Sequence, residues 1–250
     1  MRHPPASERA FITLIYFGFL FVGDFMYDRI IKLLGEENIK VFNETKVLLI
    51  GLGGVGGYVF ESLIRTGFKD ITIIDKDAFD LTNLNRQILA TKATIGKEKV
   101  NVAALRAKTI DDTIRIKTIT KYLQKEDITP SFLSDFDYVI DACDDTMVKV
   151  TLMTVCAHNN IKLISSMGTA NRTHPEFLTL TKLKDTRNDP LAKKIRHLLK
   201  DDKRALNTPV LCSIELPKKS KGLGTICAVP MAAGSIISAY VINDIKKEGY

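Results

Sequence analysis

Short apolar runs alternate with amphipathic segments along most of this chain, beginning near residue 46. Apolar runs of roughly four to eight residues indicate buried strands, and apolar residues spaced three or four apart indicate helices. The pattern predicts an α/β fold, Rossmann-like, with a mostly parallel sheet and helices on both faces. The predicted strands cover residues 46–50, 71–75, 114–119, 138–141 and 163–166, and the predicted helices cover residues 55–65, 97–110 and 146–158.

The segments on either side of this alternation follow other patterns. Apolar spacing predicts two short helices over residues 27–42, interrupted at Gly35. Beyond Gly168, the pattern predicts a strand over 177–183, a helix over 189–200 and a closing helix over 231–245. The polar and basic residues 201–224 predict a loop.

Composition places the chain among ordinary globular proteins. Of its 250 residues, 45% are hydrophobic and 26% are charged, which suits one folded domain. The net charge of +7 is compatible with an RNA partner, and equally with a plain basic surface. The four cysteines form no C-x-x-C pair, so we expect no structural zinc of the usual spacing, and we expect a cytoplasmic protein.

The first 25 residues differ from the rest. Residues 10–22 are uncharged and apolar, but this run is shorter than the ~20 residues that span a bilayer. No small-x-small cleavage site follows it, as a secretory signal would require. Three interpretations remain: a membrane-surface anchor, an apolar segment packed on the body, and a tail upstream of a true start at Met26. We favour the last and treat residues 1–25 as an extension of doubtful status.

A glycine-rich turn follows the first predicted strand. Gly51, Gly53, Gly54 and Gly56 stand between that strand and the next helix, where glycines allow the backbone to approach a phosphate closely. Asp75 closes the second strand, where a carboxylate can hold a ribose hydroxyl. These features fit NAD and ATP equally well.

Amide, cationic and acidic side chains gather in the loop and helix that follow the second strand. They suit a triphosphate attacked at its α-phosphorus better than a nicotinamide dinucleotide. In this order they resemble the ThiF/MoeB/HesA superfamily of adenylating enzymes, which are related to ubiquitin-activating enzyme. The segment from Asp141 to Asp145 resembles the second acidic element of that superfamily. The residues of the loop and helix are Asp77, Asn83, Asn85, Arg86, Gln87 and Lys99.

The resemblance implies a role for each of these residues. ATP would lie on the glycine turn with its ribose on Asp75, and Asp77, Asn83, Asn85 and Gln87 would complete its site. Arg86 and Lys99 would stabilise the transferring charge, and Asp144 would hold Mg²⁺. Arg29 would cross the interface of a homodimer to the partner's triphosphate. The structural alternatives are a turn cap for Asp77, an exposed helix position for Arg29, an amide cap for Asp141 and a helix N-cap for Asp145.

The C-terminal half resembles one branch of the superfamily, the tRNA threonylcarbamoyladenosine dehydratases. In that branch a basic helix opens at the motif matched by Asp189-Pro-Leu-Ala, and a strand follows at the motif matched by Pro209-Val…Ser213-x-Glu215. This order carries the resemblance, and residues 165–172 contain no cysteine. The resemblance implies an ATP-dependent, ligase-type enzyme that adenylates the carboxylate of the modified adenosine beside the anticodon and closes a ring with release of AMP. The basic residues that would bind the tRNA are Lys193, Lys194, Arg196 and Lys200.

Other functions remain open at this point. One alternative is an adenylyltransferase that activates the Gly-Gly terminus of a sulfur-carrier protein, and another is a nicotinamide-dependent oxidoreductase. A sulfur-transfer partner protein and peripheral membrane association through residues 10–22 also stay open. Cys227 is interpreted as a buried apolar side chain rather than a sulfur-handling thiol. We divide residues 26–250, one adenylating domain, into a nucleotide-binding half at about 46–166 and a substrate-binding half at about 167–250.

Overall fold

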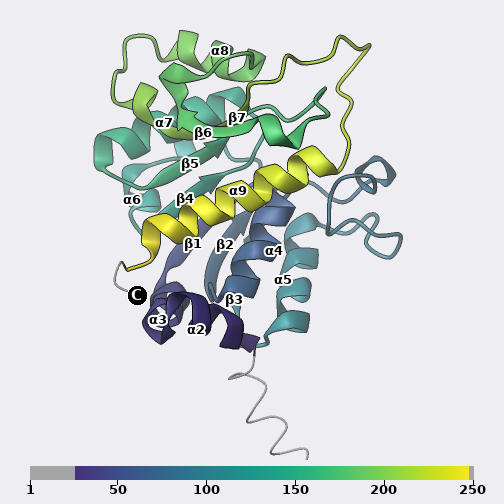
Figure 1. Ribbon diagram of the computed structural model, residues 1–250, viewed down its shortest axis with the longest axis vertical. Helices are drawn as coiled ribbons and strands as arrows, with labels where there is room; N and C mark the ends of the chain where they lie inside the picture. Colours follow the sequence, from purple (N-terminus) through teal and green to yellow (C-terminus); the bar gives the residue numbers. More distant parts are fainter. Residues whose placement is uncertain (1–25, 248–250) are drawn as a thin grey trace, which may run out of the picture.

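The computed structural model describes residues 26–247, which share one seven-stranded sheet of order β3-β2-β1-β4-β5-β7-β6 (Figure 1). All neighbouring strands are parallel except β6, which runs antiparallel to β7 at one edge. The strands are β1 (Lys46–Ile50), β2 (Asp70–Ile74), β3 (Arg115–Ile119), β4 (Tyr138–Asp141), β5 (Leu163–Ser166), β6 (Leu178–Lys182) and β7 (Pro209–Ser213).

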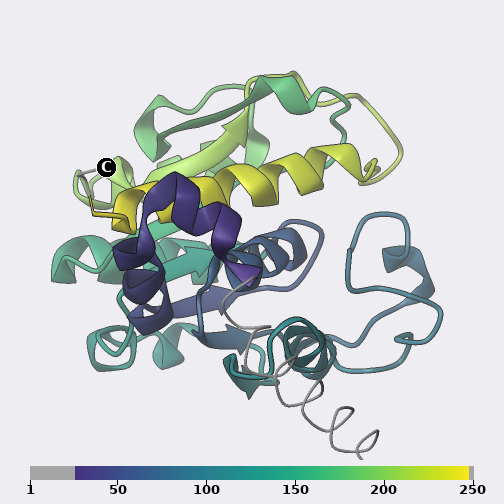
Figure 2. The same cartoon turned by 60° about the horizontal axis from the view of Figure 1, so that its bottom comes forward.

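Helices cover both faces of the sheet, as predicted. Side chains alternate along β1: Val47 and Leu49 pack into a core with α4, α5 and α9, whereas Leu48 and Ile50 pack into a second core with α7 and α8. Figure 2 shows α9 lying across the first of these faces. The helices are α2 (Asp28–Leu34), α3 (Glu36–Glu44), α4 (Gly56–Thr66), α5 (Lys99–Ile110), α6 (Pro130–Leu133), α7 (Thr146–Asn159), α8 (Pro190–Leu198) and α9 (Ala228–Ile245).

Helix α9 packs directly on α4. A Cβ atom on Gly234 would lie 2.6 Å from Cβ of Tyr58, so only glycine permits this approach. Within residues 26–247, α9 is the one helix long and apolar enough to cross a membrane by length and composition. Its buried residues Ala233, Ile237 and Val241 belong to the core, which accounts for that composition.

The prediction of a loop over residues 201–224 is wrong, because β7 lies inside it. Val210, Leu211 and Cys212 are buried between β5 and β6, but polar residues surround this short run and mask it in the polarity pattern. The strand that the resemblance implied at Pro209-Val…Ser213-x-Glu215 is the one present. The other predicted strands and helices are present with shifts of a few residues, and α2 and α3 meet at Gly35. The three interpretations of residues 1–25 concern a segment that lies outside the described residues.

Candidate active site

A cavity of about 1570 Å³ lies at the carboxyl ends of β1, β2, β4 and β5. Strand β1 has β2 on one side and β4 on the other, so the helices that follow β1 and β4 leave the sheet on opposite faces. Ligands of open α/β sheets bind in the crevice that such a divergence creates. The segment between β2 and α5 projects beside this crevice and forms part of its wall (Figures 1 and 2).

The glycine turn forms the floor of the cavity beside β1. Gly51, Gly53 and Gly54 line the cavity, whereas Gly56 does not. A Cβ atom on Gly56 would lie 1.9 Å from the carbonyl oxygen of Gly51, so this glycine allows the turn to close on the first residue of α4. The turn thus exposes backbone at the amino end of a helix, where an anion is favoured.

Two carboxylates organise the edge of the cavity after β2. The Asp75 carboxylate accepts hydrogen bonds from the backbone N–H groups of Leu52, at 2.6 Å, and Asp77, at 2.8 Å, and so ties β2 to the glycine turn. Asp77 Oδ2 lies 3.0 Å from Nζ of Lys99, whose side chain is buried at the start of α5. Asp77 therefore balances the Lys99 charge, a role that its proximity in sequence to Asp75 does not indicate.

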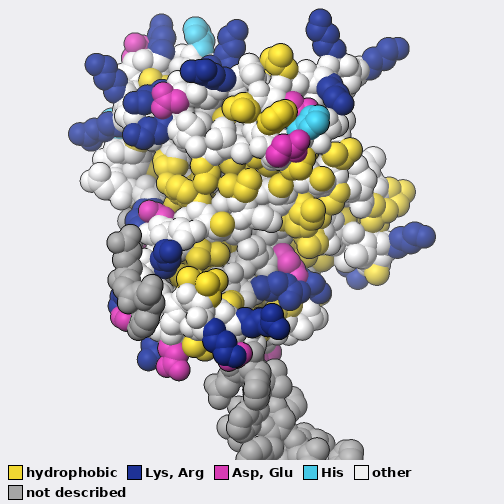
Figure 3. Space-filling view, viewed as in Figure 1, with side chains coloured by type: hydrophobic (Ala, Val, Ile, Leu, Met, Phe, Trp, Pro, Cys, Tyr) yellow, Lys and Arg dark blue, Asp and Glu magenta, His cyan; other side chains and the backbone are white. Residues whose placement is uncertain are grey.

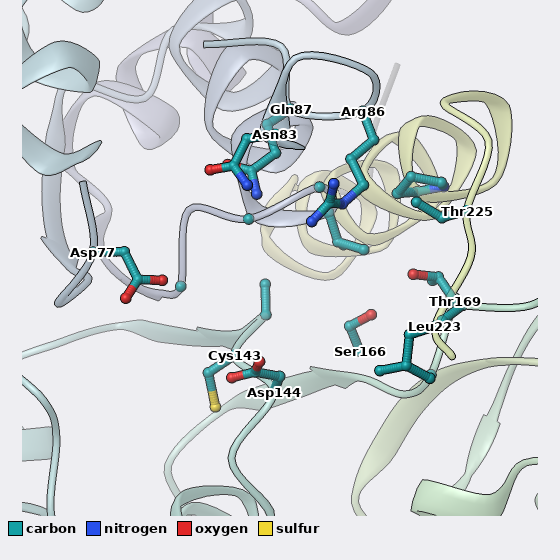
Figure 4. A pocket seen from close by; sticks show the side chains of 18 of the residues that line it. Asp77, Asn83, Arg86, Gln87, Cys143, Asp144, Ser166, Thr169, Leu223 and Thr225 are labelled. Atoms are coloured by element: carbon teal, nitrogen blue, oxygen red, sulfur yellow. The ribbon is translucent and has the colours of Figure 1, made fainter. Parts of the chain in front are cut away.

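Arg86 reaches into the cavity from the projecting segment, across from Asp144 and Ser166 (Figure 4). Its Nη1 atom donates to the carbonyl oxygen of Thr82 at 2.6 Å and to Oδ1 of Asn85 at 3.0 Å. Asn85 in turn donates to the carbonyl oxygen of Thr225, just before α9.

Asn83 and Gln87 come from the same segment and also line the cavity. Asn83 Oδ1 accepts from the backbone N–H of Asp80 in a capping box that shapes the short helical turn Leu81–Asn83. Gln87 is buried, and its Oε1 atom has no hydrogen-bond partner among the described residues.

The acidic segment after β4 contains a buried ion pair that the sequence patterns did not indicate. Asp141 Oδ2 accepts from Lys149 Nζ at 2.9 Å and from Ser165 Oγ at 2.5 Å, and both charged side chains are fully buried. Burial alone would lower the pKa of Lys149, but the adjacent Asp141 carboxylate outweighs it and raises that pKa. The one sequence signal for Lys149 was a lysine within the apolar run of a predicted helix.

The Asp141 carboxylate accepts from the backbone N–H of Cys143, which confirms the amide-capping role. It also forms an ion pair with Lys149. Asp145 is the N-cap of α7, as its structural alternative predicted, because Oδ1 accepts from the N–H groups of Met147 and Val148. Burial raises the pKa of the Cys143 thiol, which lines the same cavity.

Asp144 is the free carboxylate of this segment. It is exposed to the cavity, and among residues 26–247 no hydrogen bond or ion pair engages it (Figure 4). The described residues contain no cluster of three or more His, Cys, Asp or Glu side chains that could hold a metal. Mg²⁺ takes one or two carboxylates and completes its shell with phosphate and water, so a single carboxylate here fits such an ion.

The cavity extends beyond this nucleotide-sized region, along the segment that follows β5. Ser166, Thr169 and Leu223 lie across the cavity from Asp77 (Figure 4). Arg172, which no motif singled out, lines this second region and is almost completely buried.

Five predicted site residues besides Gly56 lie outside the cavity. Arg29 is exposed on α2 and lies outside the cavity, which fits both a plain exposed helix position and a role in the site of a neighbouring chain. Arg196 Nη1 donates to the carbonyl oxygen of Thr186 at 2.8 Å and is half-buried. The remaining three, Lys193, Lys194 and Lys200, are exposed on or just after α8.

A model of the ThiF family matches residues 27–241. This chain belongs to the ThiF family. Within the family, it is 32% identical over 234 residues to tRNA threonylcarbamoyladenosine dehydratase of Bacillus subtilis (strain 168), which covers 86% of this chain and 92% of the relative. The crystal structure of the Escherichia coli tRNA N6-threonylcarbamoyladenosine dehydratase in complex with ATP superimposes with a TM-score of 0.82, at 30% identity, over 86% of this chain and 91% of that one.

A ThiF-family relative of the alternative class matches over a shorter stretch. Molybdopterin-synthase adenylyltransferase of Haemophilus influenzae is 33% identical over 131 residues, which is 52% of this chain and 52% of the relative. Neither the family nor these relatives is named for nicotinamide chemistry, so the oxidoreductase alternative has no support.

Proposed function

We propose that this protein is an ATP-dependent tRNA threonylcarbamoyladenosine dehydratase, a ligase-type enzyme of tRNA modification. The observation that carries the proposal is the extent of the likeness: a relative with that name matches over 92% of its own length, in both halves of the chain. The cavity has room for two substrates side by side, a nucleotide over the glycine turn and an acyl group beside the segment after β5. Activation of a sulfur-carrier protein is the weaker alternative, because the adenylyltransferase that represents it matches only half of this chain.

The nucleotide region would bind ATP as follows. Gly51, Gly53 and Gly54 allow the phosphates to approach the backbone, and Asp75 accepts from the ribose. Arg86 and Lys99 stabilise the negative charge that builds up at the α-phosphorus. Lys99 Nζ lies 3.0 Å from Asp77 Oδ2. A phosphate oxygen would therefore bind Lys99 either together with Asp77 or in its place.

Asp144 would hold Mg²⁺ together with phosphate oxygens and water, and the bound ion would neutralise phosphate charge. The buried pair of Asp141 and Lys149 stands at the start of the same acidic segment. Asp141 fixes the backbone N–H of Cys143, the residue before Asp144, so the pair orients the loop that presents this free carboxylate.

Ring closure needs no enzyme nucleophile. Once the carboxylate is adenylated, the ureido nitrogen of the same nucleoside is already tethered close to it, which gives a high effective concentration. Cys143, whose thiol lines the cavity, has a pKa raised by burial and stays protonated near neutral pH, so it is a poor nucleophile. AMP then leaves, and the net change in the nucleoside is the loss of one water.

The tRNA would approach over α8. Its first residues, Pro190 and Leu191, line the cavity, and the exposed Lys193, Lys194 and Lys200 follow along the same helix and just beyond its end. Figure 3 shows Lys and Arg side chains projecting along the edge of the molecule where α8 lies. Such cations contribute binding to the phosphate backbone without reading bases.

We also propose a homodimer that forms through an apolar band. Figure 3 shows hydrophobic side chains gathered across the face formed by α9 and β6. Phe177, Leu180 and Met231 are each about 40% exposed, and a large apolar patch is a feature of surfaces that bind another protein. A second copy would cover them, and sedimentation velocity of the purified protein would reveal it. Arg29 of one copy would then complete the site of the other, in the cytoplasm where ATP and tRNA meet.

The decisive experiment supplies the protein with ATP, Mg²⁺ and tRNA that carries threonylcarbamoyladenosine. Nucleosides are then released under mild, amine-free conditions, and their masses are measured by mass spectrometry. We expect the nucleoside to lose one water, with AMP and pyrophosphate formed in equal amounts. An unchanged nucleoside, together with ATP–pyrophosphate exchange on a Gly-Gly carrier protein, would transfer the assignment to the carrier-activating enzymes.

A further inference from the structure

Arg172 lies at the wall of the second region of the cavity, in the segment that follows β5. Its side chain is only 1% exposed. The Nη2 atom donates to the carbonyl oxygen of Asn188 at 2.9 Å and lies 3.6 Å from Oδ2 of Asp189. The Nε and Nη1 atoms are buried and have no hydrogen-bond partner among the described residues.

Asp189 neutralises this charge but cannot satisfy the remaining donors. Its Oδ2 accepts from the backbone N–H of Gly168 at 3.0 Å, and its Oδ1 accepts from that of Ala192 at 2.9 Å as the N-cap of α8. A guanidinium group stays protonated at any physiological pH and presents five N–H donors. Buried donors without partners are costly, and they are rare in native proteins unless an acceptor arrives from outside.

The residue before Arg172 encloses this region. Asn171 has a left-handed φ of 59°, donates through Nδ2 to the carbonyl oxygen of Gly222, and accepts at Oδ1 from the N–H of Gly224. It thereby holds the strap of residues 222–225 beside the cavity, which Leu223, Gly224 and Thr225 help to line. The Arg172 side chain is 1% exposed, and a hydrogen bond formed in such low-dielectric surroundings is stronger than one at the surface.

We propose that Arg172 binds the acyl side chain of the modified nucleoside and makes the enzyme specific for it. Nε and Nη1 would donate to oxygen acceptors of that side chain, a carboxylate or ureido oxygen, on the side of the cavity away from Asp77. This inference rests on the proposed function. It assigns to Arg172 a role in recognising the modification itself, whereas the lysines of α8 contact the tRNA backbone.

The test separates recognition of the side chain from a structural role. Arg172→Lys keeps the charge beside Asp189 but removes most of the planar donor set. Arg172→Gln removes the charge as well. Arg187→Lys is the matched control, because Arg187 is an exposed arginine in the loop that carries Asn188. Each variant is compared with the wild type in three measurements: the thermal midpoint, the affinity for ATP, and the affinities for modified and unmodified tRNA of the same sequence.

For Arg172→Lys we expect the preference for modified over unmodified tRNA to fall at least about 10-fold, as the removal of hydrogen bonds to a charged group would produce. The KM for modified tRNA should rise by a similar factor, and ATP affinity should stay within about two-fold. Arg187→Lys should resemble the wild type throughout. A preference that survives in Arg172→Lys overturns this inference alone, even if Arg172→Gln fails to fold. A wild-type protein that neither prefers the modified tRNA nor removes water from it overturns the proposed function and this inference together.

Discussion

The Nζ atom of Lys149 lies 2.9 Å from Oδ2 of Asp141, and neither side chain has exposed surface. Lys149 also donates to the carbonyl oxygen of Ser166 at 2.7 Å, so the pair joins the ends of β4 and β5 beneath the cavity. A buried ion pair adds little net stability when intact, but loss of one partner leaves an uncompensated charge. The pair is thus a sensitive point for both the fold and the loop that carries Asp144.

Removal of Lys149 alone should destabilise the protein strongly. For Lys149→Met we expect a loss of about 3–5 kcal/mol in the free energy of unfolding, measured by urea denaturation. The double variant Asp141→Asn/Lys149→Met should lose less than the sum of the single changes, because it leaves no unpaired charge. Lys108→Met, at an exposed position of α5, is the control and should change stability by less than about 0.5 kcal/mol.

The ion pair of Asp141 and Lys149 should stay charged over the whole neutral pH range. The pKa of Lys149 is raised, so its contribution to stability is present below the ordinary lysine pKa and is lost as the pH rises through the raised value. Wild-type and Asp141→Asn/Lys149→Met stabilities should therefore differ by a constant amount between about pH 6 and pH 9, since the double variant leaves no buried carboxyl group to titrate. A difference that grows as the pH rises through this range would show that Lys149 is neutral in the folded state.

Replacement by alanine should disrupt the fold at Gly56 but be tolerated at Gly53. Gly56→Ala places a Cβ atom 1.9 Å from the Gly51 carbonyl oxygen, so the turn or α4 must shift, and we expect low solubility or a large drop in melting temperature. A Cβ atom on Gly53 meets nothing within 4 Å, so Gly53→Ala should fold normally. If Gly53→Ala nevertheless binds ATP weakly, the added methyl group occupies space that the nucleotide needs.

Loss of Arg86 should affect chemistry without affecting the fold. Among residues 26–247 its side-chain hydrogen bonds reach only Thr82 and Asn85 in the same segment, so Arg86→Ala should melt close to the wild type. We expect its rate of water loss from the modified nucleoside to fall at least about 100-fold, as for other groups that stabilise transition-state charge. Lys92→Ala, an exposed cation of the same segment, should keep full activity. Equal losses in both variants would point to a general charge effect.

The thiols of the core should resist alkylation. Burial raises the pKa of Cys156 to about 12 and also raises that of Cys143, so few thiolates are present at about pH 8. Peptide mapping after iodoacetamide treatment should find both far less modified than an unstructured cysteine peptide under the same conditions. Rapid labelling of Cys143 in the folded protein would contradict its assignment as an inert thiol.

The basic residues of α8 should divide into two kinds. Lys193→Gln/Lys194→Gln should weaken tRNA binding and reduce the slope of affinity against salt by about one unit for each phosphate that the lysines no longer neutralise. Arg196→Gln should instead reduce stability, because the guanidinium group holds the carbonyl oxygen of Thr186. If Arg196→Gln changes the salt slope as much as the lysine pair does, Arg196 also contacts the RNA.

Local patterns predicted much of this fold, because the apolar periodicity of a strand or helix is visible within a few neighbouring residues. The strands at 46–50, 138–141 and 163–166 coincide with β1, β4 and β5. The polarity pattern missed β7, which only the order of motifs in the resembling branch had indicated. Its burial comes from β5 and β6, which are distant in sequence, and not from its own short apolar run. Its neighbours in space are what make it a strand.

The sequence by itself determined the family, the order of the elements and the residues from Gly51 to Asp144 that meet at one end of the sheet. These follow from short-range spacing, since parallel strands bring their carboxyl ends to one edge. Only the tertiary structure decided that Asp77 pairs with Lys99, that Asp141 pairs with Lys149, and that Arg172 has free donors in the interior. A charged residue in the sequence carries no sign of its burial or partner, because both depend on which elements pack against it.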